Sequence, residues 1–312
     1  MSSSTGRLDD ALAQLPHLGR PLEIRELPGG LTNHNFRVRT ASHDVVVRLS
    51  STTTDLLSVD RDHEWVNSRA AATAGVGAPV VDYLPGQGVL VVGFLPGITY
   101  TADDVEANLP RLAATLRRLH GGPPFASRFD MFGVQRRYAE VVAARRMPLP
   151  AGYDDLASTV ARVEQALRLR PETLVPCHND LLAANILDDG GDLRIIDYEY
   201  SGMNEPSFEL GNLACESHLD RGALTQLVAS YSGRATEGTE DTEALAALVA
   251  RAELWGMVGR YAWTLWGVIQ HSVSDVEHDF WAFAMERFEP AAALLTSPRL
   301  DALLSAVTAD PA

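Results

Sequence analysis

The chain begins with about a hundred residues patterned as short strands and continues with helical patterning. Apolar runs of four to eight residues bounded by glycine and turn residues are typical of β-strands. Residues 60–74 have a helical composition that ends at Gly75, which predicts one helix among the strands. The five predicted strands, rich in Val, Ile and Phe, are residues 22–27, 35–40, 44–49, 80–84 and 88–92. An antiparallel sheet with a helix on one face is the simplest way to bury such strands.

From residue 101 onward the apolar positions recur with the period of a helix. Two such stripes are Leu109, Leu112, Leu116, Leu119 and then Leu156, Val160, Val163, Leu167. Two short strands, 185–187 and 193–196, interrupt this pattern and are joined by a turn at 188–191. The chain after residue 205 is predicted to be mostly helical, with a loop at 236–242 and a frayed tail after 308. The fold class is therefore α+β.

Charge and composition exclude several kinds of function. The 312 residues carry 41 acidic and 26 basic side chains, for a formal net charge of −15, and every basic residue is arginine. An acidic chain argues against a nucleic-acid partner, which requires a basic surface. Without lysine, a Walker-type phosphate loop and Schiff-base chemistry are excluded. Any phosphate site in this protein must use arginine.

The two cysteines and the distribution of apolar residues predict a cytoplasmic protein. Cys177 and Cys215 are too few for a disulfide scaffold and are expected to be small buried residues in a reducing compartment. The N-terminal segment lacks the charged and apolar regions of a signal peptide. The most apolar helical stretch, 254–270, is interrupted by Arg260 and falls short of the roughly 20 residues that span a bilayer.

The segment 177–185 and the second aspartate at 197 carry the candidate chemistry. His178, Asp180 and Asn185 form the pattern H-x-D-x-x-x-x-N, and Asp197 follows at the end of a predicted hairpin. In kinase chemistry such an aspartate accepts the proton of the attacking hydroxyl, and the asparagine and second aspartate hold Mg²⁺. Asp and Asn are also common in turns and caps, but the four-residue pattern with the hairpin favours catalysis. His178 is expected to orient the loop.

These motifs, with further segments, resemble the choline/ethanolamine kinase branch of the aminoglycoside-phosphotransferase-like kinases. The resemblance implies a bilobal protein-kinase-like fold with ATP in the cleft. It implies a nucleotide-binding lobe at 1–94, with an antiparallel sheet and one helix, and a larger, mainly helical catalytic and acceptor-binding lobe at 95–312. The segments that carry it are 29–36, 45–48, 60–64, 177–185 and 197–201 with its continuation to 209–212.

The nucleotide site is expected to be built mainly from the first lobe. Arg48 stands where related kinases place the lysine that contacts the α- and β-phosphates, and arginine keeps that charge. Glu64, on the following helix, is expected to pair with Arg48. The loop between the first two strands offers backbone and side-chain donors for phosphates, and the segment after the fifth strand is the expected adenine hinge. The remaining predicted contacts are Gly29, Gly30, Thr32, Asn33 and Asn35 in that loop, and Gly93, Phe94 and Leu95 in the hinge.

The acceptor is expected to be a cationic amine held by aromatic faces and a carboxylate. Trp263 and Trp266 are three residues apart and so share one face of a helix. That spacing also fits an aromatic core stripe, but the run 261–267 resembles the choline-pocket helix of the family. The other expected acceptor residues are Asp180, Tyr200, Glu216 and Phe283. At 280 and 283 this chain has phenylalanine where relatives often have tyrosine, so two hydroxyls are missing from the expected pocket.

The sequence therefore predicts an ATP- and Mg²⁺-dependent kinase that phosphorylates the hydroxyl of a small amino alcohol, choline or ethanolamine first. An aminoglycoside kinase shares the catalytic loop but requires a wide, acid-rich acceptor cleft. A nucleotide-binding protein without transferase activity is the alternative of another class. Both alternatives stay open at this point.

Overall fold

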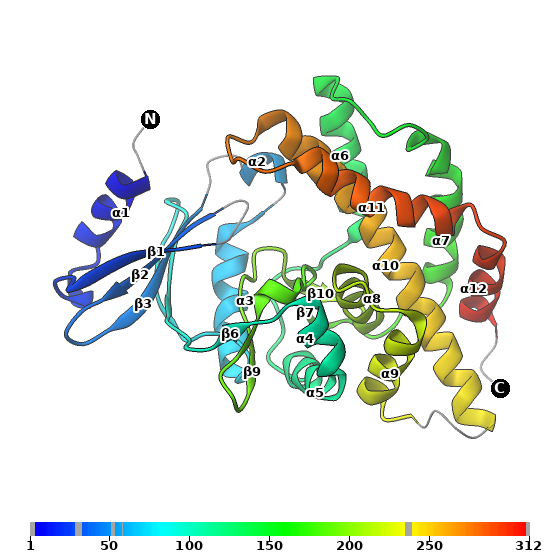
Figure 1. Ribbon diagram of the computed structural model, residues 1–312, viewed down its shortest axis with the longest axis horizontal. Helices are drawn as coiled ribbons and strands as arrows, with labels where there is room; N and C mark the ends of the chain where they lie inside the picture. Colours follow the sequence, from blue (N-terminus) through cyan, green and yellow to red (C-terminus); the bar gives the residue numbers. More distant parts are fainter. Residues whose placement is uncertain (1–3, 29–32, 51–53, 58, 235–238, 310–312) are drawn as a thin grey trace.

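The structure is a computed structural model that describes residues 4–28, 33–50, 54–57, 59–234 and 239–309. A five-stranded antiparallel sheet lies at the N-terminal end of the molecule, and helices make up most of the remainder (Figure 1). The predicted α+β fold class is thus confirmed. The boundary expected after residue 94 stays a prediction.

The large sheet has the strand order β1-β2-β3-β5-β4, and every neighbouring pair is antiparallel. The predicted strands agree with the observed ones to within two residues at each end. The helix predicted at 60–74 also forms, and the side chain of Asp60 caps it by accepting hydrogen bonds from the Asp62 and His63 N–H groups. These elements are β1 (Glu23–Leu27), β2 (Asn33–Arg39), β3 (Asp44–Ser50), α3 (Arg61–Thr73), β4 (Val80–Leu84) and β5 (Val89–Gly93).

The alternation of side chains along β3 decides what each face of the sheet does. Val45, Val47 and Leu49 are buried in a core with Leu8 and Leu15. The residues between them, Val46 and Arg48, point to the opposite face and line a cleft. A strand with period two therefore anchors the sheet with one set of residues and supplies the site with the other.

The N-terminal region contains more helix than the single one predicted. The helix α1 (Ser4–Ala13) packs against the sheet through Leu8 and Ala11, and α2 (Thr54–Leu57) follows β3. The prediction was wrong because α1 is short and polar on its exposed side, so its helical state depends on apolar contacts with β3 that are remote in sequence.

Smaller sheets flank the segment 177–185 and Asp197, which carry the candidate catalytic residues. The strands β6 (Ile98–Thr99), β8 (Ile186–Asp188) and β9 (Leu193–Ile195) form one sheet, with β8 and β9 as the predicted hairpin. In the other sheet, β7 (Val175–Cys177) pairs with β10 (Gly202–Asn204). The pairing of β7 with β10 brings the chain just before His178 beside the chain that follows Asp197.

The helical part is organised around α10 (Thr239–Val273), which contains 35 residues and packs against α6, α8, α11 and α12. Its start shows that part of the loop predicted at 236–242 is helical instead, while residues 235–238 lie outside the described residues. Within the described part of the chain, no helix has the length and apolar character needed to cross a membrane. The other helices are α4 (Ala102–Ala107), α5 (Leu109–His120), α6 (Met131–Arg145), α7 (Ala157–Leu169), α8 (Pro206–Glu216), α9 (Arg221–Ser232), α11 (Phe280–Leu295) and α12 (Arg299–Thr308).

Two glycines let α8 and α10 cross with their backbones in contact. A Cβ atom on Gly211 would lie 2.0 Å from the carbonyl oxygen of Ala252, and one on Gly256 would lie 2.6 Å from the carbonyl oxygen of Gly211. Any larger residue would force the two helices apart. The crossing matters because α8 carries residues that hold the catalytic loop.

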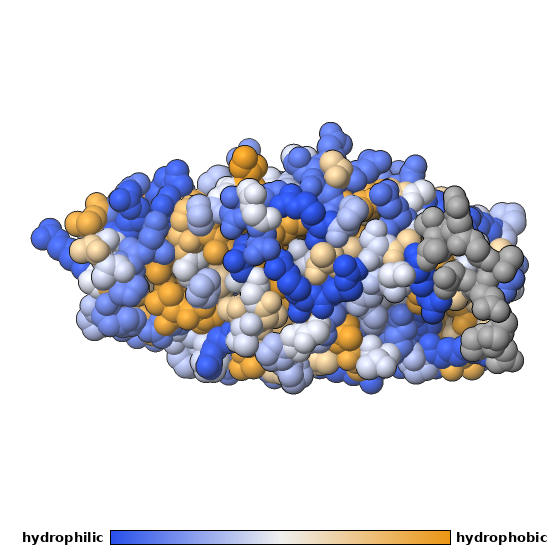
Figure 2. Space-filling model, turned by 90° about the horizontal axis from the view of Figure 1, so that it is seen from below, coloured by the Kyte–Doolittle hydropathy of each residue, from blue (hydrophilic) through white to orange (hydrophobic). Residues whose placement is uncertain are grey.

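The surface is mainly hydrophilic on the face shown in Figure 2, where hydrophobic residues occur in separate groups between charged ones. This distribution agrees with the acidic composition. Cys177 and Cys215 are free, with Cys177 fully buried and Cys215 only partly so.

Candidate active site

The loop after β7 carries Asp180 and is held in a strained conformation. Asn179 has a φ of 68°, in the left-handed region that non-glycine residues rarely adopt. Its side chain stabilises this conformation, because Nδ2 donates to the Tyr200 carbonyl at 3.0 Å and Oδ1 accepts from Asn204 Nδ2 at 2.9 Å. Both partners follow Asp197 in the chain, and pairing of β7 with β10 brings them beside Asn179. Strain maintained by its surroundings is typical of active sites.

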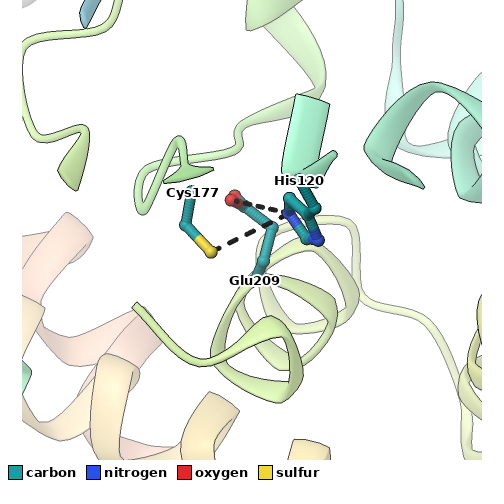
Figure 3. Close-up of side chains that lie close together, drawn as sticks. All are labelled: His120, Cys177 and Glu209. Atoms are coloured by element: carbon teal, nitrogen blue, oxygen red, sulfur yellow. Dashed lines mark hydrogen bonds and ion pairs between the residues drawn. The ribbon is translucent and has the colours of Figure 1, made fainter. Parts of the chain in front are cut away.

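The buried carboxylate of Glu209, on α8, holds the backbone of the same loop. It accepts hydrogen bonds from the backbone N–H of His178 at 2.5 Å and of Asn179 at 3.2 Å. His120 Nε2 lies 3.6 Å from Glu209 and 3.8 Å from the sulfur of Cys177 (Figure 3). Burial works to raise the pKa of Glu209, but His120 and His178, the latter also through its backbone N–H, hold it below the usual value. Glu209 is therefore a carboxylate that stabilises the loop.

The sequence interpretation missed His120 and gave Glu209 no role. His120, Cys177 and Glu209 place their ligand atoms within 4.8 Å of one another and are all buried. The glutamate oxygens already accept bonds from the loop, and His120 Nδ1 lies 2.7 Å from the hydroxyl of Tyr231. This cluster is accounted for as a loop anchor. His178 also behaves as expected, since its Nε2 bonds to the Ile196 carbonyl at 2.8 Å and so joins the two motifs.

Asp180 and Asn185 lie together as the motif predicts. Asn185 Nδ2 donates to the Asp180 carbonyl at 3.1 Å. Among the described residues, none donates a hydrogen bond to Asn185 Oδ1. Burial raises the pKa of the Asp180 carboxyl well above its usual value, and the negative charges of Glu216, Glu199 and Asp197 raise it further. A carboxylate with a raised pKa is suited to accept a proton near neutral pH.

Asp197 is placed at the floor of the cleft, facing the sheet. Its backbone is also left-handed, with a φ of 70°, and its Oδ1 lies 2.7 Å from Arg48 Nη1. Asn185 and Asp197 thus offer an amide oxygen and a carboxylate from the two motifs. Oxygen donors of this kind are the ligands that Mg²⁺ prefers.

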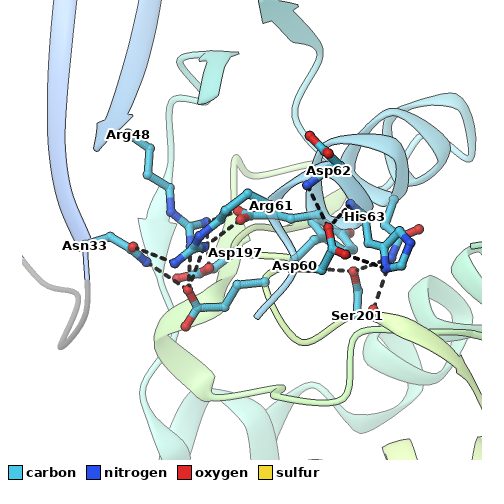
Figure 4. A network of polar contacts seen from close by, with 12 residues as sticks. Asn33, Arg48, Asp60, Arg61, Asp62, His63, Asp197 and Ser201 are labelled. Atoms are coloured by element: carbon cyan, nitrogen blue, oxygen red, sulfur yellow. Dashed lines mark hydrogen bonds and ion pairs between the residues drawn. The ribbon is translucent and has the colours of Figure 1, made fainter. Parts of the chain in front are cut away.

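Arg48 contacts three carboxylates in a charged network, part of which Figure 4 shows. Nη1 contacts both Asp197 Oδ1 and Glu64 Oε1 at 2.7 Å, and Nη2 contacts Glu199 Oε2 at 2.8 Å. The expected contact between Arg48 and Glu64 is therefore present, and it is buried. Asn33 belongs to the same network, because its Nδ2 donates to Glu199 at 3.0 Å. Glu199 lies in the segment 197–201 that resembles the family, but the sequence did not predict this role.

A cleft of about 550 Å³ lies between the sheet and the two motifs. The predicted contacts Asn35, Arg48 and Gly93–Leu95 all line it, with Asp197 on the opposite side. Val46, Leu90, Ile195 and similar side chains make the rest of the lining apolar. An apolar slot with charged groups at one end fits a flat base carrying phosphates. Glu64 lies outside the lining behind Arg48, and Gly29, Gly30 and Thr32 lie outside the described residues.

The predicted aromatic residues meet beside the catalytic loop. Trp266 Nε1 donates to the Tyr200 hydroxyl at 3.0 Å, and the rings of Tyr200 and Trp263 make an edge contact with centroids 4.9 Å apart. The ring centroids of Phe283 and Trp266 lie 5.0 Å apart. Tyr200, Trp263 and Trp266 expose only 4–7% of their surface and belong to the hydrophobic core. Their role in acceptor binding stays a prediction.

Glu216 is brought to this cluster already paired with a cation. Arg287 Nη2 lies 2.5 Å from Glu216 Oε2, and the Arg287 guanidinium carbon lies 3.4 Å above the ring of Phe283. The sequence interpretation did not single out Arg287. Its position four residues after Phe283 on one helix face was the available signal.

Comparison with known proteins identifies the family. The sequence model described as choline/ethanolamine kinase matches residues 24–292. The chain belongs to this family. The kinase is 28% identical to protein LicA of Haemophilus influenzae over 276 residues, which covers 86% of this chain and 78% of that protein. This kinase is thus a phosphotransferase with an alcohol group as acceptor.

Solved structures agree with the fold. A choline/ethanolamine kinase family protein from Mesorhizobium loti is similar to this kinase with a TM-score of 0.81 and 32% identity, covering 97% of this chain and 99% of that one. Aminoglycoside phosphotransferase APH(4)-Ia, solved with ADP and hygromycin B, gives a TM-score of 0.57 at 15% identity, over 96% and 99% of the chains. That likeness concerns the fold alone.

Proposed function

We propose that this kinase transfers the γ-phosphoryl group of ATP to the hydroxyl of choline, with Mg²⁺ as cofactor. The observation that carries the proposal is that Asp197 meets Arg48 at the charged end of the cleft, while His178 joins the loop that holds Asp180 and Asn185 to Ile196, the residue before Asp197. Ethanolamine, the other amino alcohol expected from the sequence, is the second candidate.

The chain's own residues supply positioning and charge. Asp180 accepts the proton of the acceptor hydroxyl, and its raised pKa suits that role. Arg48 binds phosphate oxygens, and the apolar lining holds the base. The available oxygen of Asn185 and the carboxylate of Asp197 fit Mg²⁺ and would hold it. When bound, the ion neutralises charge on the phosphates.

Choline is preferred because the aromatic cluster of Tyr200, Trp263, Trp266 and Phe283 offers few free hydrogen-bond acceptors for N–H groups. A primary ammonium brings three donors that need partners, whereas a quaternary ammonium needs only aromatic faces. The carboxylate of Glu216 is engaged by Arg287, and the Tyr200 hydroxyl accepts from Trp266. Phe280 and Phe283 contribute no hydroxyl at all.

A coupled ADP-release assay with ATP and Mg²⁺ tests the proposal. Choline, ethanolamine and kanamycin are compared at equal concentration, with a reaction lacking acceptor as the control. We expect choline to give the highest kcat/KM. Turnover of kanamycin but not choline would assign the protein to antibiotic phosphorylation. ATP binding with no acceptor-dependent ADP release would favour a nucleotide-binding protein without transferase activity.

A further inference from the structure

Arg61 is a second arginine buried in the charged network around Arg48. It is the first residue of α3, and its side chain is only 13% exposed. Its Nη1 lies 2.6 Å from Glu64 Oε2 and 3.1 Å from Glu199 Oε2, and its Nη2 lies 3.4 Å from Asn33 Oδ1 (Figure 4). No role had been expected for this residue.

The helix itself does not explain a cation at this position. The N-terminal end of a helix has a positive partial charge, which favours acidic residues and disfavours arginine. Asp62 and Glu64 follow that preference in the first turn of α3, whereas Arg61 opposes it. Its interactions with the network must therefore account for its placement.

Arg61 and Arg48 together neutralise part of the negative charge of the carboxylates in the network. Glu64 bridges the two arginines, with Oε1 on Arg48 and Oε2 on Arg61. Oε2 of Glu199 likewise contacts both arginines. Asp197 contacts Arg48. The network thus holds two guanidinium groups and three carboxylates, so one negative charge is left over even with both arginines present.

Without Arg61, Arg48 would be the only cation of the network beside three carboxylates. Unpaired buried carboxylates are costly, so Arg48 would be held more tightly among them and be less able to contact phosphates. We propose that Arg61 is a positioning residue for nucleotide binding, which keeps Glu64 and Glu199 compensated while Arg48 turns to the phosphates. This inference rests on the proposed phosphate-binding role of Arg48.

Equilibrium binding of ATP, measured by calorimetry without acceptor, tests this role. Arg61→Gln is expected to raise the Kd for ATP about tenfold or more. Arg61→Lys is expected to stay within about threefold of the unmodified protein, because a single nitrogen, Nη1, makes both ion pairs and an ammonium can replace it. The matched control is Arg69→Gln, which makes the same change on the exposed side of the same helix.

The melting temperature of each variant separates positioning from stability. A purely structural role would lower the melting temperature of Arg61→Gln and leave its Kd for ATP unchanged, and that result would overturn the proposal. If Arg61→Gln does not fold, Arg61→Lys decides the question: a tenfold loss of ATP affinity with an unchanged melting temperature contradicts charge compensation. Failure of the unmodified protein to bind ATP would instead refute the proposed function.

Discussion

The guanidinium group of Arg287 lies 3.4 Å above the ring of Phe283 and binds the carboxylate of Glu216 at the same time. An internal cation thus occupies one aromatic face and the one carboxylate expected to meet the amine. In the proposed acceptor site, this arrangement leaves the substrate ammonium to interact with the tryptophan and tyrosine rings. The proposed preference for a quaternary amine rests on it.

Removing this internal cation should change acceptor preference. Arg287→Gln releases the Glu216 carboxylate, which can then accept hydrogen bonds from a primary ammonium. We expect the ratio of kcat/KM for ethanolamine to that for choline to rise about tenfold, the scale of one charge-assisted hydrogen bond. Arg299→Gln, which breaks the pair between the exposed Arg299 side chain and Glu253, is the control. An unchanged ratio would place the amine away from Glu216.

The catalytic aspartate should affect turnover far more than nucleotide binding. Asp180→Asn keeps the size of the side chain but removes the carboxylate proposed to accept the proton. We expect kcat to fall about a hundredfold or more, with the Kd for ATP nearly unchanged. Both quantities are measured on one preparation. Near-normal turnover would mean that another residue accepts the proton.

The raised pKa of Asp180 predicts the acidic side of the pH–rate profile. Activity requires the ionised carboxylate, so kcat/KM should fall as the pH drops through a pKa above the usual range for aspartate. Glu216→Gln removes a neighbouring negative charge, lowers the pKa of Asp180 and moves this limb to lower pH. Glu289→Gln, an exposed change on α11, should not move it. A shift in the opposite direction contradicts the assignment.

Arg48 should be required for nucleotide affinity through its charge and its shape. Arg48→Ala is expected to abolish measurable ATP binding, because the remaining carboxylates repel phosphates. Arg48→Lys should restore part of the affinity, since one ammonium cannot replace two nitrogens that contact three carboxylates. Arg39→Ala, which changes an exposed arginine at the end of β2, controls for loss of a cation. Unchanged ATP affinity in Arg48→Ala would mean that another group binds the phosphates.

Trp266 should matter for the amine rather than for ATP. Trp266→Ala is expected to raise the KM for choline at least tenfold and to change the KM for ATP little. Trp255→Ala is a matched control, because Trp255 is equally buried on the same helix and donates from Nε1 to Glu205 at 2.9 Å. It should lower stability and leave the KM for choline unchanged. Equal effects of Trp266→Ala on both KM values would make it a core residue only.

Much of the fold was predictable from local pattern. The strands of the large sheet and α3 were placed to within two residues, because alternation and capping residues are properties of adjacent positions. The helix α1 was missed, since its short apolar face is stable only against the sheet. The pairing of Arg48 with Glu64 was predicted from the family resemblance, and the structure brings the two together.

The sequence alone determined which side chains are available to this protein: Asp180, Asn185 and Asp197 at their spacing, and arginine as the one basic residue type in a chain without lysine. The tertiary structure decided which groups share those charges. Arg61 meets Glu199 across 138 positions, and Glu209 reaches the catalytic loop from α8. Folding decides which buried charges come within about 3 Å of one another and so become partners. No local stretch of sequence contains that information.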